Sequence, residues 1–127
     1  MACFDSNFLI AWLQNDADAL KKLEKLQHSP ASTTMINAFE LYKGIYRSKD
    51  KEKDIQKVKE LLNSLELLTL DHESARMAGE LDANMKSNTI GEADLLIASI
   101  VLTNGETLIT RNTKHFERVP GLMVESW

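Results

Sequence analysis

Short apolar segments alternate with longer amphipathic segments along the whole chain, and this alternation constrains the fold more than any other feature. The longer segments repeat apolar residues at helical spacing, whereas the short ones have the length and composition of buried strands. The short segments lie at residues 1–4, 31–34, 65–70, 107–110 and 122–124. Strands that alternate with helices predict an α/β fold with a mostly parallel central sheet and right-handed crossovers. At 127 residues the chain is expected to form one domain, 1–127.

The helices between these strands are delimited by residues that favour helix ends. Ser6 or Asn7 can cap the first helical region, and Pro30 ends it. Further helices are predicted from Met35, over 50–64, from Asp71 to about Lys86 and over 91–103.

The composition excludes several classes of protein. With 43% hydrophobic and 27% charged residues, the chain is ordinary for a globular protein. No apolar run reaches the ~18–20 residues that span a bilayer, and the first residues lack the features of a signal peptide. The single cysteine, Cys3, has no partner within the chain, so we expect a cytoplasmic protein that does not bind membranes.

The net charge of −4 argues against a protein that simply coats nucleic acid, but this charge is unevenly distributed. Residues 43–59 hold seven cations and three anions, a net charge of +4, which leaves −8 for the rest of the chain. This stretch is either a solvated helix face with i,i+4 pairs or a patch that faces phosphates. Arg111, Lys114 and Arg118 form a second, smaller basic group.

Three acidic residues occupy positions that an α/β fold can bring together. Asp5 ends the first expected strand, Glu40 interrupts an apolar helix, and Asp94 lies in the first turn of the helix at 91–103. Taken singly, they are explained as a helix N-cap, a solvent-facing side chain and a residue that complements the helix dipole. Taken together, they can converge at the carboxyl edge of a parallel sheet, where a cluster of like charges needs a divalent cation.

Oxygen ligands without a His or Cys cluster favour Mg²⁺ or Mn²⁺ over Zn²⁺. Such a site can bind phosphate oxygens and activate a water molecule. The three histidines, His28, His72 and His115, show no metal-ligand spacing. Of the other acids near helix starts, Glu92 is interpreted as complementing the helix dipole and Asp71 as an N-cap.

Four sequence blocks resemble one family and together span nearly the whole chain. They are CFDSNFLI at 3–10, ELYKG at 40–44, IGEADLLIA at 90–98, and LITRN at 108–112 with its continuation HF, VPGL and Trp127. These blocks resemble the PIN-domain ribonucleases, and the tail resembles the VapC-type toxins of toxin–antitoxin pairs. The resemblance implies a PIN-like three-layer α/β/α sandwich.

The resemblance also implies a Mg²⁺- or Mn²⁺-dependent endoribonuclease in which Asp5, Glu40 and Asp94 bind the metal. The family's fourth acidic position falls at Asn112, a neutral ligand at best, which supports one metal site and not a second. Thr110 and Asn112 would then assist by hydrogen bonding, and Glu92 is a further candidate for the missing charge. The candidate substrate-binding residues are Ser6, Asn7, Lys43, Arg111 and Lys114.

The expected partners follow from the same resemblance. They are an RNA substrate, a small VapB-like antitoxin protein that inserts a basic side chain into the acidic site, and a second copy of the chain in a homodimer. The candidate contact residues, each of which could instead pack in the core, are Phe8, Trp12, Leu13, Ile45 and Tyr46. Nothing in the sequence identifies the RNA, because RNA recognition depends on shape and single-stranded context.

Two other functions remain open at this point. The neutral residue Asn112 motivates a PIN-like binding module without nuclease activity. A phosphoacceptor receiver domain would use Asp71 at a strand end, but Ser6 and Asn7 stand where a receiver needs acids beside Asp5.

Overall fold

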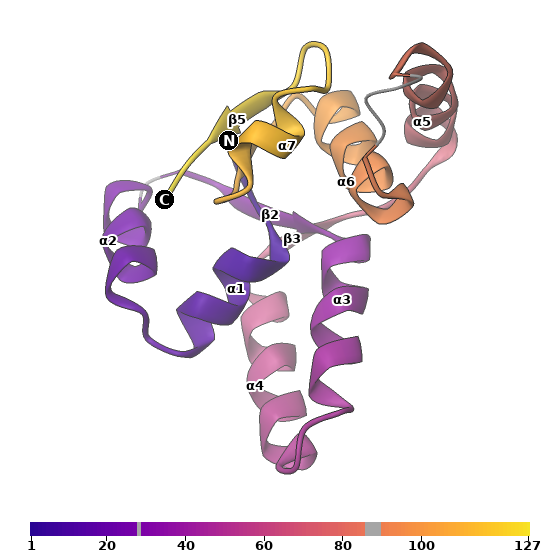
Figure 1. Cartoon of the computed structure of the whole chain (residues 1–127). Helices are drawn as coiled ribbons and strands as arrows, with labels where there is room; N and C mark the ends of the chain where they lie inside the picture. The colour runs from indigo at the N-terminus through magenta and orange to yellow at the C-terminus, as the bar shows by residue number, and fades with distance from the viewer. Residues whose placement is uncertain (28, 86–89) are drawn as a thin grey trace.

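One parallel sheet organises the molecule in the computed structural model, which describes residues 1–27, 29–85 and 90–127 (Figure 1). Its five strands have the order β3-β2-β1-β4-β5, and every neighbouring pair is parallel. The strands are β1 (Ala2–Phe4), β2 (Ala31–Thr34), β3 (Glu66–Leu68), β4 (Thr107–Ile109) and β5 (Met123–Glu125). The predicted α/β class with a parallel sheet is therefore confirmed, and each predicted strand is present, some shorter or shifted by a residue or two.

Seven helices connect and follow these strands within the described residues. They are α1 (Ser6–Leu13), α2 (Ala17–Lys25), α3 (Met35–Ile45), α4 (Lys51–Asn63), α5 (His72–Met85), α6 (Glu92–Thr103) and α7 (Thr113–Phe116). The first helical region is divided because Asn15 adopts a left-handed backbone, with φ of 57°, and Asp16 caps a new helix. The cap of α1 is Asp5 and not Ser6 or Asn7. The predicted end of α5 near Lys86 lies outside the described residues.

Side chains that alternate along β1 and β4 divide the core in two. Phe4 and Ile109 pack with α1, α3 and α4, whereas Cys3 and Leu108 pack with α5 and α6 on the other face. This alternation follows from the two-residue period of a strand. The sheet therefore lies between two helical layers, which is the predicted three-layer sandwich (Figure 1).

The strand order changes direction at β1, the central strand. The chain first adds β2 and β3 on one side of β1 within the sheet and later adds β4 and β5 on its other side. Crevices form at the carboxyl ends of strands at such switch points. Because Phe4 is paired with Ile109, the next residues on the two strands, Asp5 and Thr110, lie beside each other at this edge.

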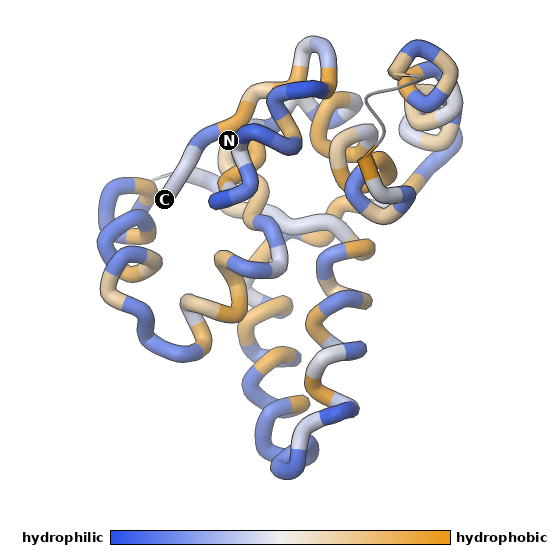
Figure 2. Tube along the Cα trace, in the orientation of Figure 1, coloured by the Kyte–Doolittle hydropathy of each residue, from blue (hydrophilic) through white to orange (hydrophobic). Residues whose placement is uncertain are grey.

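Helices α3 and α4 project beyond the sheet as a pair (Figure 1), and hydrophilic residues dominate the tip where they join (Figure 2). This tip carries most of the basic stretch at 43–59. Within the described residues, none of the helices has the length and apolar character needed to cross a membrane.

Candidate active site

Asp5 lies at the centre of the site because it directly follows the central strand β1. It is 7% exposed, and its carboxylate accepts three hydrogen bonds. Oδ1 accepts from the Ser6 N–H at 2.9 Å and from the Asn37 amide at 3.1 Å, and Oδ2 accepts from the Thr110 hydroxyl at 2.8 Å. Asp5 thus caps α1 and also faces a polar cluster, so its two sequence interpretations are compatible.

Burial raises the pKa of Asp5 above its ordinary value of 3.8, and the negative charge of Asp94 shifts it in the same direction. The hydrogen bonds from Thr110, Ser6 and Asn37 oppose this rise, because they favour the ionised carboxylate. The site therefore pairs two repelling carboxylates with neutral donors, an arrangement in which a cation would be stabilising.

Glu40, the second predicted acid, reaches the same cluster from α3. Its Oε1 accepts a 2.6 Å hydrogen bond from the Ser6 hydroxyl, and the Asn37 amide lies 3.4 Å away. The side chain is half-buried, so it is not the freely solvated helix residue that the simpler interpretation required. The structure therefore brings Glu40 and Asp5 into one hydrogen-bonded group.

Asp94, the third acid, lies in the first turn of α6, and its partner was not predicted. Its Oδ2 is 2.9 Å from Nε2 of His115, which lies on the short helix α7. The sequence offered no signal for this pair, because the two residues are 21 positions apart and α7 spans only four residues. His115 thus contacts the acid cluster, although its spacing from the other histidines gave no reason to expect it.

Thr110 and Asn112 lie on the segment after β4. The Thr110 hydroxyl donates to Asp5 and accepts from the Asn112 N–H at 3.0 Å. The Asn112 side chain is exposed and makes no capping hydrogen bond to α7. Glu92 is also exposed, on the first turn of α6.

The residues predicted to bind the substrate differ in whether their side chains already contact other parts of the protein. Arg111 stacks 3.8 Å from the ring of Trp127, donates to the Trp127 carbonyl and pairs with Asp18 at 2.9 Å. Lys43 and Lys114 are exposed, as is Asn7. Ser6, in contrast, is buried and already bonded to Glu40.

An apolar groove of about 340 Å³ opens beside Glu40, between α1, α3 and α4. Ile10, Leu13, Leu41 and Ile45 line it. Of the predicted contact residues, Trp12, Leu13 and Ile45 are half-buried and Tyr46 is 60% exposed.

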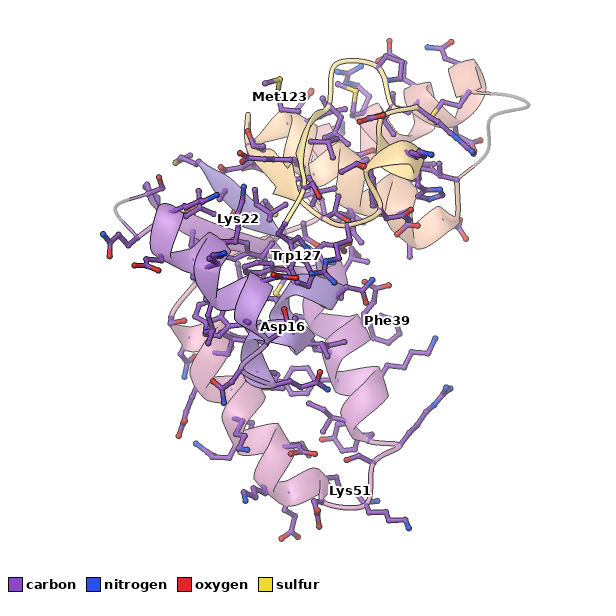
Figure 3. The ribbon with its side chains drawn as sticks, turned by 60° about the vertical axis from the view of Figure 1, so that its left-hand side comes forward. Asp16, Lys22, Phe39, Lys51, Met123 and Trp127 are labelled. Atoms are coloured by element: carbon purple, nitrogen blue, oxygen red, sulfur yellow. The ribbon has the colours of Figure 1, made fainter. Side chains whose placement is uncertain are left out.

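Phe8 packs in the core, which is the alternative that the sequence left open for it, and is therefore not available as a contact residue. Phe8 is fully buried, because it stacks on Phe4 at 4.5 Å and meets the edge of Trp127 at 5.0 Å. Phe39, in contrast, points outward from α3 (Figure 3) and is 61% exposed.

Asp71, which a receiver domain would phosphorylate, acts as a helix cap. Its carboxylate accepts from the Ser74 N–H at 2.9 Å, and the Ser74 hydrogen bonds lower its pKa below 3.8. It follows β3, the edge strand, and lies outside the Asp5 cluster. The predicted N-cap role is confirmed, and the geometry gives no support to a receiver.

The donor set around Asp5 fits a hard divalent cation. Carboxylate oxygens come from Asp5, Glu40 and Asp94, and an amide oxygen is available from Asn112. Across residues 1–27, 29–85 and 90–127, no three Asp, Glu, His or Cys side chains are already arranged as a metal-binding cluster. The fit therefore rests on the chemistry of the donors and on the repulsion between Asp5 and Asp94 that a cation would relieve.

Comparison with known proteins gives one consistent family. The PIN domain model matches residues 2–122. Ribonuclease VapC2 of Rickettsia felis is 32% identical over 127 residues, which cover 97% of this chain and 95% of the relative. The tRNA(fMet)-specific endonuclease VapC of Salmonella typhimurium is 28% identical over 125 residues, with the same two coverages.

Solved structures agree with the sequence comparison. The crystal structure of VapBC2 from Rickettsia felis bound to a promoter DNA fragment matches with a TM-score of 0.90 and 29% identity. It covers 99% of this chain and 98% of that chain. DNA-bound VapBC from Salmonella typhimurium also gives a TM-score of 0.90, at 27% identity, covering 99% of this chain and 97% of that chain.

Proposed function

Because the chain belongs to the PIN domain family and, within it, to the VapC ribonucleases, we propose that it is a Mg²⁺- or Mn²⁺-dependent endoribonuclease, the toxin of a toxin–antitoxin pair. The observation that carries this proposal is the hydrogen-bonded group that joins Asp5 to Glu40 at the carboxyl edge of the sheet, with Asp94 near enough to raise the pKa of Asp5. These three carboxylates would hold the cation. When bound, it neutralises charge on the phosphodiester and lowers the pKa of the attacking water.

The protein's own groups prepare this site. Thr110 holds Oδ2 of Asp5, and the backbone N–H of Asn112 donates to the Thr110 hydroxyl, so the fourth acidic position of the family is filled here by a neutral, exposed side chain. Lys43, whose ammonium group lies 5.9 Å from the Phe39 ring centroid, and Lys114 are exposed and would contact RNA phosphates, whereas Arg111 first has to leave Trp127 and Asp18. The basic tip of α3 and α4 offers further phosphate contacts.

The test is cleavage of RNA with Mn²⁺ by the unaltered protein and by Asp5→Asn and Asp94→Asn. Initiator tRNA is the first substrate to use, because the Salmonella relative carries that specificity in its name. We expect either substitution to reduce cleavage about 1000-fold. Glu106→Gln, a buried acid far from the cluster, is the matched control. Equal cleavage by all four proteins would refute the proposal. No cleavage by any of them, with partner binding retained, would favour the binding module suggested by Asn112.

We further propose a small VapB-like antitoxin and a homodimer as the assembly. The structural neighbours are VapBC complexes, and the apolar groove beside Glu40 could take an apolar segment of a partner that also places a basic side chain among the acids. Mass measurement by light scattering, with and without a co-expressed antitoxin, tests both. A monomer in both samples would refute both.

A further inference from the structure

Asn37 is a polar side chain that the sequence analysis did not identify, and it is fully buried. It lies on α3 one turn before Glu40, inside the hydrogen-bonded group that joins the acids. A buried amide needs partners for its two donors and its acceptor, since a buried polar group without a hydrogen bond destabilises the fold. The partners of Asn37 are unusual. One is Asp5, a proposed metal-binding acid, and another is Ser6, which is itself bonded to Glu40, a second proposed acid.

The orientation of this amide is fixed from the start of α3. The Thr34 hydroxyl donates to Oδ1 of Asn37 at 2.7 Å and accepts from the Asn37 backbone N–H at 3.1 Å. The amide NH₂ must therefore face away from Thr34. The opposite orientation would set the Asn37 oxygen against the Asp5 oxygen, two acceptors with no proton between them.

The NH₂ group then joins two elements of the fold. It donates to Oδ1 of Asp5 at 3.1 Å and to the Ser6 hydroxyl at 2.8 Å, and the Ser6 proton goes to Glu40 at 2.6 Å. One neutral side chain on α3 thereby connects the acid that follows β1 with the acid on its own helix. It also holds these like charges in place without adding a charge.

We propose that Asn37 is a positioning residue that sets the relative placement of Asp5 and Glu40 for cation binding. This inference rests on the proposed function. Groups that orient metal ligands through hydrogen bonds contribute about 10- to 100-fold to metal affinity. Asn37 would act on the affinity for the cation, and it would not touch the RNA.

Asn37→Ala tests this role, with Thr33→Val as the matched control. Thr33 is also fully buried next to β1, and its hydroxyl donates to the Phe4 carbonyl at 2.7 Å, so the hydrogen bond that it makes goes to the backbone and not to a carboxylate. Mn²⁺ binding is measured by calorimetry on the full chain without RNA, and cleavage is measured across a Mn²⁺ titration. Asn37→Ser, which keeps one donor, replaces Asn37→Ala if the latter does not fold.

We expect Asn37→Ala to weaken Mn²⁺ binding about 10- to 100-fold and Thr33→Val to change it less than about 2-fold. Saturating Mn²⁺ should restore the kcat of Asn37→Ala, with the KM for RNA unchanged. Unaltered Mn²⁺ binding in Asn37→Ala, or equal losses in both variants, would overturn the inference alone. An unaltered protein that binds no Mn²⁺ and cleaves no RNA would overturn it together with the proposed function.

Discussion

Asp5 and Glu106 are both buried acids next to strands of the same sheet, with exposed fractions of 7% and 4%. They lie at opposite ends of the strands, Asp5 at the carboxyl end and Glu106 at the amino end. Asp5 follows β1, whereas Glu106 precedes β4, and the two strands are parallel neighbours. Burial raises the pKa of each carboxyl above its ordinary value. By burial and pKa direction alone, the two residues would be equivalent candidates for a functional site.

Hydrogen-bond partners and neighbouring acids distinguish Asp5 from Glu106. Both oxygens of Asp5 accept hydrogen bonds, and a second acid lies close enough to raise its pKa. Within the described part of the chain, Oε2 of Glu106 has no hydrogen-bond partner, and the Met1 amino group is 4.0 Å away. Donors directed at a carboxylate, with further acids beside it, therefore distinguish an organised site from a buried charge.

Beyond the acids themselves, the largest effect on cleavage should come from removing a donor of Asp5. Thr110→Val keeps the shape of the side chain but removes the hydroxyl that holds Oδ2, so we expect cleavage to fall about 10- to 100-fold. Initial rates on the same RNA measure this change. Thr33→Val controls for loss of a buried hydroxyl, and a similar fall in that variant would attribute the effect to general loosening of β1.

A smaller effect should follow at Asp94, which is less enclosed. The Asp94 side chain is 32% exposed, and within the described residues its side-chain partner is His115, at 2.9 Å. His115→Ala should lower cleavage about 10-fold, at the lower end of the range for groups that orient ligands. His72→Ala, at the exposed start of α5, is the control. Unchanged cleavage in His115→Ala would show that Asp94 needs no orientation by α7.

Glu106→Gln should stabilise the fold, because a buried carboxylate with an unpartnered oxygen is replaced by a neutral amide. We expect the free energy of unfolding at pH 7 to rise by about 1 kcal/mol. Since the folded-state pKa of Glu106 lies above 4.5, its favourable contribution is present below pH 4.5 and is lost as the pH rises through the folded value. Urea unfolding at several pH values should show the gain appearing above pH 4.5. A gain that is constant with pH would contradict this account.

The effect of Asp5→Asn on the free energy of unfolding should be smaller than that of Glu106→Gln, a stabilisation below about 1 kcal/mol at pH 7. The pKa of Asp5 is raised above 3.8, so the sign is the same as for Glu106. Three donors already offset part of the cost of burying Asp5, which reduces the gain. If Asp5→Asn stabilised the protein more than Glu106→Gln in urea unfolding, the contrast between the two acids would be wrong.

Much of this architecture could be predicted because it depends on local patterns. Short apolar segments predicted the positions of all five strands, and the expected starts of helices identified Asp5, Asp71 and Asp94. Strand order at a switch point then explains why Asp5 and Thr110 meet. Choosing between a helix cap and a member of a polar cluster at Asp5 was not necessary, because the same carboxylate caps α1 and accepts hydrogen bonds from Asn37 and Thr110.

The parts that could not be predicted depend on contacts between distant elements. Asn37 resembles any polar residue in an apolar helix until α3 packs beside Asp5. His115 lies on a four-residue helix that is too short for a periodic signal. The apolar helix face of Phe8 was compatible with either a core or a contact role, because the aromatic group that covers it is assembled from distant parts of the chain, β1, α1 and Trp127.

Trp127 lies between Phe8 and Arg111, and Arg111 directly follows Thr110. Its indole is therefore an internal optical reporter of the segment that carries Thr110 and Asn112. The chain has one other tryptophan, Trp12, so Trp12→Phe would leave a single emitter in this position. The intrinsic fluorescence of that variant would report when Arg111 leaves the ring for a polyanion, without any label added to the protein.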